Sequence, residues 1–517
     1  MTWPVLFVLF FVPSAAWAVA SPLFSVADEP AHTVKAVATW HGQLSGPETP
    51  GPGYLANVYQ VPAIWQSAFL VPECYKFQRN NTPDCAPELS GGSEMIGVLV
   101  PAGHYPPLFY ILVGWAGRLV PSAAGVYLMR MTSALLVAAF LALATRTLAR
   151  IIRPGFAVIG VLVAATPMTY FLAGSVNPSG FETAAAISVW AHALAILRGR
   201  TVVPDGVELG TGADEADAPE RVPRDLLVGL VVSSAALALT RQLSGMFLVG
   251  ILVLATLTSS PRRLSGLVRQ RGVQVALGGL AVAIGLGAVF VVSTGNPSAM
   301  TGKAIENGTG PLAAVIGETD AYLRQMVGVF GWLDTRSPQL SYYLWIGIVF
   351  AMVGFVAVAS KLRTSAPLLL TVAVTLTLPL IELPNAATSG LPWQGRYSLP
   401  VAVGIPLIAV VLIDPLARRI PGFSRRTIAA IATAVGIGNV YAFYWALRRY
   451  VVGGDRGFNI LTGGAWQPPL GSAALLVVMV VFAAAAVFVA VRAPEHALDE
   501  PLDAVDDVPD QGAVLTR

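Results

Sequence analysis

The chain has 517 residues, of which 55% are apolar and 12% are charged, and its mean hydropathy is +0.67. Soluble domains carry about 25% charged residues, so this composition excludes a soluble globular protein. The net charge is +3 at pH 7, and the sequence has no basic stretch with interleaved aromatic residues, which excludes nucleic acid as a partner.

Apolar runs near the roughly 20 residues that cross a bilayer predict an all-α polytopic membrane protein. Backbone groups in lipid must bond within their own segment, so each run is expected to be a helix. About twelve runs are present, and they cover residues 3–20, 125–145, 155–174, 180–197, 226–240, 243–259, 273–293, 342–360, 365–382, 397–414, 427–446 and 471–491. We expect one transmembrane domain over residues 1–492, with long outer loops at 21–124 and 294–341, and a disordered acidic cytoplasmic tail at 493–517.

The first run contains Ala16-Trp17-Ala18, which resembles a signal-peptide cleavage site. No Lys or Arg precedes it, and we expect the run to remain attached as the first helix. With the N-terminus in the cytoplasm, the short connections rich in Arg and Lys fall on the inner side, as the positive-inside rule requires. The sequence thus predicts a multi-pass plasma-membrane protein with both termini in the cytoplasm and an extracytoplasmic site.

The first outer loop contains both cysteines of the chain, Cys74 and Cys85. Outside the cytoplasm we expect them to form a disulfide, with two free thiols as the alternative. Later in this loop, residues 106–120 are apolar but short, and Arg118 lies near their end. Counting them as a span would break the charge pattern, so we expect an interfacial helix with its Tyr and Trp at the outer leaflet.

Two adjacent carboxylates, Asp28 and Glu29, follow the first helix on its expected outer side. A carboxylate suits anchoring poorly there, and one of the two could act as a general base that takes a proton from an acceptor hydroxyl. If the segment after Pro30 is helical, Glu29 shares a face with His32, and Lys35 follows within one turn. The alternative is that the pair caps a helix, since acidic residues favour helix starts.

Further polar residues recur near the expected outer ends of the later helices. They are His104, Tyr105, Arg130, Asn177, Glu182, Arg241, Gln242, Gln394, Arg396 and Tyr397. The planar guanidinium group matches phosphate oxygens, so the three arginines, together with the carboxylates, predict a lipid-phosphate substrate. Structural alternatives are snorkelling for Arg130, helix capping for Glu182, and a turn with an aromatic anchor for His104 and Tyr105.

Several short motifs resemble those of the DUF2142 family of bacterial membrane proteins. They are Ser21-Pro22-Leu-Phe-Ser-Val-Ala-Asp28-Glu29-Pro30-Ala31-His32, His104-Tyr-Pro106-Pro107-Leu, Gly174-Ser-Val-Asn177-Pro178, Phe330-Gly331-Trp332-Leu333-Asp334-Thr335 and Gly395-Arg396-Tyr397-Ser-Leu-Pro400. Together they span roughly residues 1–415, and the fourth motif adds Trp332 and Asp334 to the expected binding site. After Asn177 the sequence reads Pro-Ser-Gly-Phe-Glu182, whereas many relatives are expected to carry an Asp close to the Asn.

The DUF2142 family is similar to the GT-C glycosyltransferases, which use polyprenyl-phosphate-linked sugars outside the cytoplasm. This resemblance implies a GT-C-like helical bundle in which an acidic residue of the first outer loop, here Asp28 or Glu29, is the catalytic base. We expect an inverting transfer to an envelope polysaccharide, glycolipid or glycoprotein at the bilayer surface. The alternatives are a transporter or flippase for a lipid-linked glycan and a non-catalytic envelope-assembly protein. The histidines show no metal-ligand spacing, and no cofactor is expected beyond a divalent cation, which the sequence leaves open.

Overall fold

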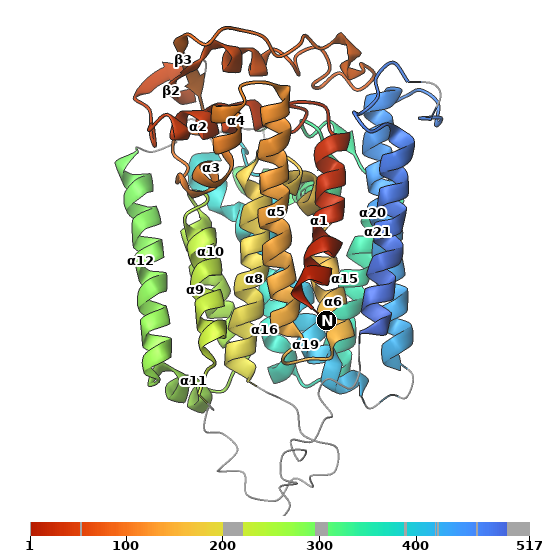
Figure 1. The fold of residues 1–517 in the computed structure, drawn as a ribbon. Helices are drawn as coiled ribbons and strands as arrows, with labels where there is room; N and C mark the ends of the chain where they lie inside the picture. The colour runs from red at the N-terminus through yellow and green to blue at the C-terminus, as the bar shows by residue number, and fades with distance from the viewer. Residues whose placement is uncertain are drawn as a thin grey trace, which may run out of the picture.

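A computed structural model of the chain describes residues 2–51, 54–199, 221–294, 305, 309–386, 390–418, 420, 423–461 and 464–493 (Figure 1). Two predictions made above fall wholly or partly on other residues. The predicted acidic tail after residue 493 and part of the predicted second outer loop (295–304 and 306–308) lie outside the described residues.

The structure is mostly helical, with a few short strands. The α-helices are α1 (Trp3–Ala20), α2 (Glu29–Trp40), α3 (Leu108–Val113), α4 (Trp115–Leu119), α5 (Ala123–Leu148), α6 (Pro154–Ala164), α7 (Pro167–Ala173), α8 (Pro178–Arg198), α9 (Arg224–Ala238), α10 (Ser244–Thr256), α11 (Pro261–Val268), α12 (Arg271–Ser293), α13 (Pro311–Gly317), α14 (Thr319–Gly328), α15 (Gln339–Ala359), α16 (Leu362–Thr377), α18 (Gly395–Ala402), α19 (Gly404–Ala417), α20 (Phe423–Val451) and α21 (Ser472–Arg492). The 3-10 helices are η1 (Ala63–Phe69), η2 (Pro83–Cys85) and η3 (Leu378–Asn385), and the strands are β1 (Glu48–Gly51), β2 (Tyr54–Pro62), β3 (Met95–Val100), β4 (Val329–Phe330) and β5 (Thr335–Arg336).

The prediction of a helical membrane-spanning bundle is confirmed, but the count of about twelve spans is not. Among the described residues, nine helices are long and apolar enough to cross a membrane, or ten if the bent pair α6 and α7 forms one span. The predicted runs at 226–240 and 243–259 are helical as α9 and α10, with 15 and 13 residues. At about 1.5 Å per residue, each reaches only about 20 Å, short of the roughly 30 Å hydrocarbon core.

The single apolar run predicted at 155–174 is broken in the structure. Its two halves, α6 and α7, meet at an angle of 72°. Pro167 restricts the backbone of Thr166, whose ψ of 165° is extended, and the helix cannot continue through that residue. The Thr166 hydroxyl then donates to the Met326 carbonyl at 2.7 Å, which attaches the break to the end of α14.

The helices form a bundle whose centre is α8, and Figure 1 shows α1, α5 and α8 between α12 on one side and α20 and α21 on the other. The apolar window of α8 is completely buried inside the protein, whereas that of α12 is only 22% buried. An α-helix surrounded by other helices and one facing lipid are both apolar all round, so hydropathy alone does not separate them.

The segment after α1 forms a cap over one end of the bundle (Figure 1). The prediction of an all-α chain missed its three-stranded antiparallel sheet, ordered β1-β2-β3, in which Tyr59 pairs with Val98. A disulfide joins Cys74 to Cys85 in this cap. The short helices α3 and α4 coincide with the interfacial helix expected at 106–120.

Candidate active site

The two adjacent carboxylates lie at the junction between α1 and the cap. α1 ends at Ala20, and α2 begins at Glu29 with Asp28 as its N-cap residue. Asp28 has φ 67°, in the left-handed region, which Asp adopts more readily than most residues. The loop is held from its other side, where the Ala27 N–H donates to the Gly331 carbonyl at 3.2 Å. The left-handed turn separates the environments of the two carboxylates.

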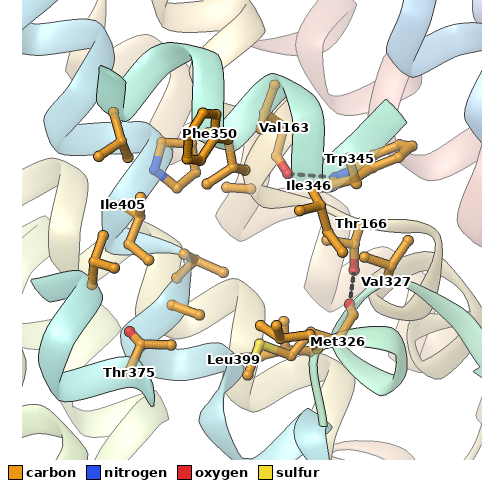
Figure 2. A pocket seen from close by; sticks show the side chains of 18 of the residues that line it. Val163, Thr166, Met326, Val327, Trp345, Ile346, Phe350, Thr375, Leu399 and Ile405 are labelled. Carbon is orange, nitrogen blue, oxygen red and sulfur yellow. Dashed lines mark hydrogen bonds between the residues drawn. The ribbon is translucent and has the colours of Figure 1, made fainter. Parts of the chain in front are cut away.

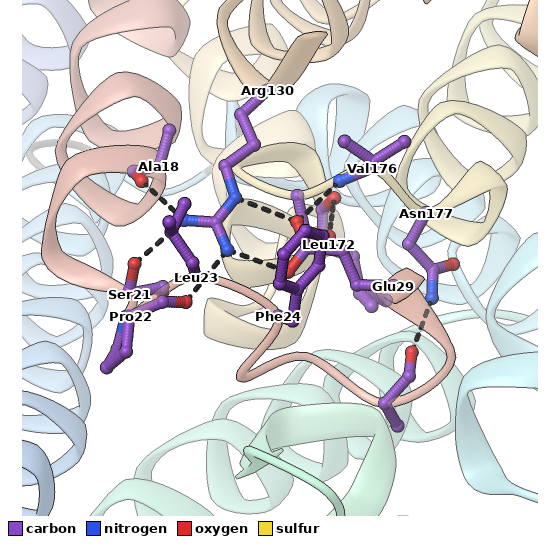
Figure 3. A network of polar contacts seen from close by, with 12 residues as sticks. Ala18, Ser21, Pro22, Leu23, Phe24, Glu29, Arg130, Leu172, Val176 and Asn177 are labelled. Carbon is purple, nitrogen blue, oxygen red and sulfur yellow. Dashed lines mark hydrogen bonds and ion pairs between the residues drawn. The ribbon is translucent and has the colours of Figure 1, made fainter. Parts of the chain in front are cut away.

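Glu29 points into the bundle and forms an ion pair with Arg130 of α5 (Figure 3). The two carboxylate oxygens accept from Arg130 Nε and Nη2, both at 2.7 Å, and Oε1 also accepts the Val176 N–H at 3.0 Å. Both side chains are 0% exposed. This is the bidentate geometry in which arginine binds a carboxylate most strongly.

Arg130 also fastens the end of α1. Its Nη1 donates to the carbonyls of Ala18 and Ser21, at 3.0 and 2.7 Å, and its Nη2 donates to that of Pro22 at 2.8 Å. An arginine has five N–H donors, and these contacts together with Glu29 use all five. Arg130 was expected to bind a substrate phosphate, but no donor is left for one.

Asp28 has a different environment, although it is the neighbouring residue. Its side chain is 42% exposed, and its Oδ2 accepts from Arg396 Nη2 at 2.7 Å. Its Oδ1 has no hydrogen bond to the described residues. Burial raises the pKa of Asp28, but the charge of Arg396, with a smaller contribution from Arg241, outweighs it and holds the pKa below the ordinary 3.8. Asp28 is therefore an ionised carboxylate with a free oxygen.

Two arginines and a tyrosine border Asp28. Arg396 lies in the first turn of α18, and Arg241 lies in the turn between α9 and α10. The Arg241 guanidinium lies 4.3 Å from the centre of the Tyr397 ring, and the Arg396 guanidinium lies 5.5 Å from the same ring. The Nε atoms of both arginines are buried without a hydrogen-bond partner among the described residues. Buried donors are nearly always paired, so these two fit an anionic ligand that accepts from them.

His32 and Tyr105 complete this group. The His32 ring stacks on Tyr105 at 5.5 Å between centroids, and the Arg241 guanidinium lies 5.4 Å from the Tyr105 ring. His32 Nδ1 is 2.9 Å from the Tyr110 hydroxyl, and burial lowers the pKa of His32 to about 3, so its imidazole is neutral near pH 7. We use the name Asp28 cluster for Asp28, His32, Tyr105, Arg241, Arg396 and Tyr397.

Glu182 and Asn177, both at the start of α8, form hydrogen bonds that hold this cluster in place. The Glu182 carboxylate accepts from Arg241 Nη1 at 3.0 Å and from the Ser244 hydroxyl at 2.5 Å. Asn177 caps α8 by accepting the Ser179 N–H at 3.0 Å, and it donates to the Ala27 carbonyl at 3.1 Å. The two residues orient Arg241 and the Asp28 loop.

Lys35 and His104 were expected in the binding site, but the structure places them inside the cap. Lys35 is fully buried, and its ammonium donates to the carbonyls of Ala102, Gly103 and Tyr105 at 2.7, 2.8 and 2.6 Å. These bonds use all three of its donors and attach the turn before α3 to α2. His104 is also buried, with Nε2 3.7 Å from the Glu48 carboxylate.

Trp332 and Asp334 lie in the turn between β4 and β5, which packs on the loop between α1 and α2. The Trp332 Nε1–H donates to the Phe24 carbonyl at 3.1 Å. Asp334 Oδ2 accepts the Phe77 N–H at 2.9 Å, which ties the turn to the disulfide-bonded part of the cap. Trp332 therefore supports the Asp28 loop, whereas Asp334 attaches the same turn to the cap.

The remaining predicted residues flank the cluster in sequence. Gln242 follows Arg241 and is half-buried, and Gln394 is the N-cap residue of α18. The structure also identifies positioning residues that the sequence did not signal: Tyr110, Ser244, and Gln325, whose Oε1 accepts the Gly395 N–H at 2.6 Å.

Among the residues that the structure describes, no group of three or more His, Cys, Asp or Glu side chains is arranged to hold a metal ion.

An apolar cavity of about 310 Å³ begins beside α18 (Figure 2). Leu399 and Val403, three and seven positions after Arg396, line it together with residues of α14, α15 and α16. Polar groups at its wall are satisfied, since Trp345 Nε1 donates to the Val163 carbonyl at 3.0 Å. The hydroxyl of Thr166 is likewise bonded to Met326. The cavity therefore offers a hydrocarbon environment close to the Arg396 end of α18.

The family described as "Predicted membrane protein (DUF2142)" matches residues 9–405. No curated protein matches the chain.

Solved structures of similar shape include ArnT from Cupriavidus metallidurans, bound to undecaprenyl phosphate and in the apo state. Both structures are 14% identical in sequence to this chain, and both matches cover 96% of it. The match covers 77% of the bound ArnT chain with a TM-score of 0.42, and 76% of the apo chain with a TM-score of 0.44. The apo oligosaccharyltransferase of Archaeoglobus fulgidus is 12% identical, with 96% of this chain and 56% of that chain covered and a TM-score of 0.36. These likenesses are distant ones, and no activity follows from them.

Proposed function

This chain belongs to the DUF2142 family of membrane proteins, and we propose that it is a glycosyltransferase that uses a sugar linked to polyprenyl phosphate. The acceptor is a hydroxyl of a cell-envelope polysaccharide, glycolipid or glycoprotein. The cap end of the bundle faces away from the cytoplasm, because the short connections rich in Arg and Lys lie at the opposite end.

The contrast between Asp28 and Glu29 carries this proposal. A general base needs an ionised group that can reach the proton it removes. Asp28 is partly exposed, has one unbonded oxygen, and lies 2.7 Å from an arginine with an unused N–H. Glu29 is fully buried and bonded through both oxygens. We therefore assign the base to Asp28 and a structural role to Glu29.

The transfer is an inverting displacement. Asp28 takes the proton of the acceptor hydroxyl, and the acceptor oxygen forms a bond to the anomeric carbon from the face opposite the phosphate. The bond between that carbon and the phosphate oxygen breaks, and polyprenyl phosphate leaves as an anion. Arg396 and Arg241 bind this phosphate through their buried Nε donors, so the charge that develops on it is stabilised without further reorganisation.

The apolar cavity suits the lipid part of the donor. A phosphate at Arg396 would lie one turn of α18 from Leu399 at the cavity wall. The polyprenyl chain would then extend into the hydrocarbon environment of the cavity. A polar head at the arginines and an apolar tail beside α18 account for both halves of one amphipathic substrate.

The test is an assay with the purified full-length protein in detergent. A polyprenyl-phosphate sugar radiolabelled in the sugar is supplied with a crude envelope fraction as acceptor, and the products are separated by chromatography. The expected result is transfer of label to the acceptor with stoichiometric release of polyprenyl phosphate. Movement of intact donor across the membrane of proteoliposomes, without release of polyprenyl phosphate, would instead establish a flippase.

The acid limb of the pH profile tests the contact between Asp28 and Arg396. The base must be ionised, and the charge of Arg396 keeps the pKa of Asp28 below 3.8, so kcat/KM is expected to stay level on the acid side until the pH falls below that value. In Arg396→Gln the opposing charge is lost, burial dominates, and the pKa of Asp28 rises. The acid limb therefore moves to higher pH. Arg396→Lys, which keeps the charge, should retain the wild-type limb; the same limb in both variants would contradict the contact.

A cavity-filling substitution tests the assignment of the lipid tail. Ile346 of α15 lines the apolar cavity, and we expect Ile346→Trp to raise the KM for a long-chain polyprenyl donor about tenfold, equivalent to displacing one or two methylene groups. The KM for a donor with only two isoprene units should not change. The control is Val358→Trp, on the same helix but 90% exposed and outside the cavity. Equal effects on long and short donors would disprove the assignment.

A further inference from the structure

A second cavity, of about 450 Å³, lies at the same end of the bundle. It is lined by no residue of the Asp28 cluster, and it shares with the site described above only the turn between β4 and β5. It is bordered by the end of α20, the turn from Asp334 to Gln339, and the disulfide-bonded part of the cap. Its lining residues include Arg79, Asp334, Arg336, Trp445, Arg448 and Arg449. Four of these are arginines and one is a carboxylate, so the lining side chains carry a formal charge of +3 (four minus one).

Two of the arginines are held rigidly by backbone carbonyls. Arg448 donates to the carbonyls of Gly454 and Gly457 at 3.0 and 3.2 Å. Arg449 donates to the carbonyls of Asn81 and Tyr75 at 2.7 and 2.6 Å. Carbonyl acceptors satisfy hydrogen bonds but do not neutralise the positive charge. The cavity therefore has a fixed cationic wall.

Arg449 also has an unused donor. It is 2% exposed, and its Nε is buried without a hydrogen-bond partner among the described residues. The nearest carboxylate, Asp334, is bonded to the Phe77 N–H and lies 3.8 Å from Arg449 Nη2. A buried, unpaired N–H on a cation at a cavity wall is best explained by a ligand with an oxyanion.

Arg336 and Arg79 lie at the open side of the cavity. Arg336 is exposed on β5 and has no ion-pair partner within the described ranges. Arg79 is 61% exposed, and its Nη2 lies 3.7 Å from Oδ1 of Asp455, which is exposed as well. Exposed guanidinium groups at a rim, with fixed ones behind them, match the oxygens of a phosphate.

Two consecutive residues of α14 connect the rim of this cavity to the segment that carries Arg396. Arg324 of α14 donates to Gln339 Oε1 at 3.2 Å, at the rim of the cavity. The next residue, Gln325, accepts the N–H of Gly395, which precedes Arg396. One helix thus contacts both places through consecutive residues.

We propose that this second cavity binds a phosphate group carried by a sugar, with Arg336, Arg79 and Arg449 as its ligands and the Trp445 ring beside the sugar. We assign this ligand as the acceptor of the transfer, and this assignment rests on the proposed glycosyltransferase function. The phosphate could be that of a soluble sugar phosphate or of a lipid headgroup, because both present anionic phosphate oxygens beside a polyhydroxylated ring.

The experiment measures binding to the purified full-length protein, independently of turnover. The soluble probe is glucose 6-phosphate, followed by the broadening of its ³¹P resonance, and the lipid probe is phosphatidylinositol, counted by native mass spectrometry against phosphatidylcholine. The double variant Arg79→Gln/Arg336→Gln is expected to bind the recognised probe about tenfold more weakly, as loss of charge-assisted hydrogen bonds implies. The control double variant Arg262→Gln/Arg269→Gln makes the same change in net charge on exposed residues of the other end and should bind as the wild type does.

The outcomes distinguish a soluble sugar phosphate from a lipid headgroup, and they test the phosphate site separately from the glycosyltransferase function. Weakening for glucose 6-phosphate alone supports a soluble sugar phosphate, and weakening for phosphatidylinositol alone supports a headgroup. No weakening for either probe, or equal weakening in the control variant, would overturn the binding site. Asp28→Asn should leave this binding unchanged, so a failure of the proposed catalysis and a failure of the second cavity are recorded by different measurements.

Discussion

Replacing Asp28 by Asn is expected to lower kcat about a thousandfold, within the range of roughly 10² to 10⁴ that a general base contributes. The amide has the same shape and can still accept from Arg396, but it cannot take the proton of the acceptor hydroxyl. Binding of the donor should change little, because Arg396 and Arg241 remain. The rate is measured as release of polyprenyl phosphate under single-turnover conditions.

The matched control is Glu94→Gln, which changes an exposed carboxylate of the same cap. It should retain the wild-type rate. If Asp28→Asn keeps more than a tenth of the wild-type turnover, the assignment of Asp28 as base is wrong. A lower rate in both variants would indicate an effect of charge on the whole cap instead of a proton transfer.

Replacing Glu29 by Gln is expected to lower the free energy of unfolding by about 3–5 kcal/mol, because it leaves the buried Arg130 guanidinium without its counter-charge. The ion pair is 0% exposed on both sides, and Arg130 also holds three carbonyls at the end of α1. Loss of the pair should therefore loosen the loop that carries Asp28. The measurement is a urea titration in mild detergent, monitored by circular dichroism.

The control pair for this prediction is exposed. Arg150 and Asp225 also form an ion pair, with side chains 38% and 59% exposed. Arg150→Gln should lower the free energy of unfolding by about 1 kcal/mol at most. In Glu29→Gln, activity per folded molecule should fall far less than in Asp28→Asn. A stable but inactive Glu29→Gln protein would reverse the roles assigned to the two carboxylates.

Hydropathy and charge placement were enough to predict the helices of the bundle, since crossing a bilayer requires long apolar segments whatever their neighbours are. The same signal misjudged α9 and α10, because apolar composition does not reveal a helix too short to cross. It also missed the strands β1 to β3, which lie in a polar loop where a few cross-strand pairs decide the structure.

The residues of the site were predicted better than their roles. Arg241, Arg396, Tyr397 and Asp28 were all in the predicted set, and the structure brings them together. Lys35, His104 and Arg130 were in the same set, yet the donors of Lys35 and Arg130 are used in internal contacts, and His104 is buried inside the cap. A polar residue near a membrane surface carries the same local signal whether it binds a ligand or a carbonyl.

The sequence by itself determined the class of protein, the position of the acidic pair after the first helix, and the supply of arginines at one end. Only the tertiary structure decided which carboxylate was buried and which was left free. Glu29 meets an arginine 101 residues away, and Asp28 meets one 368 residues away. Hydropathy records the cost of placing one residue in lipid or water, whereas pairing depends on which helices pack together, and that information lies in the combined shape of the whole bundle.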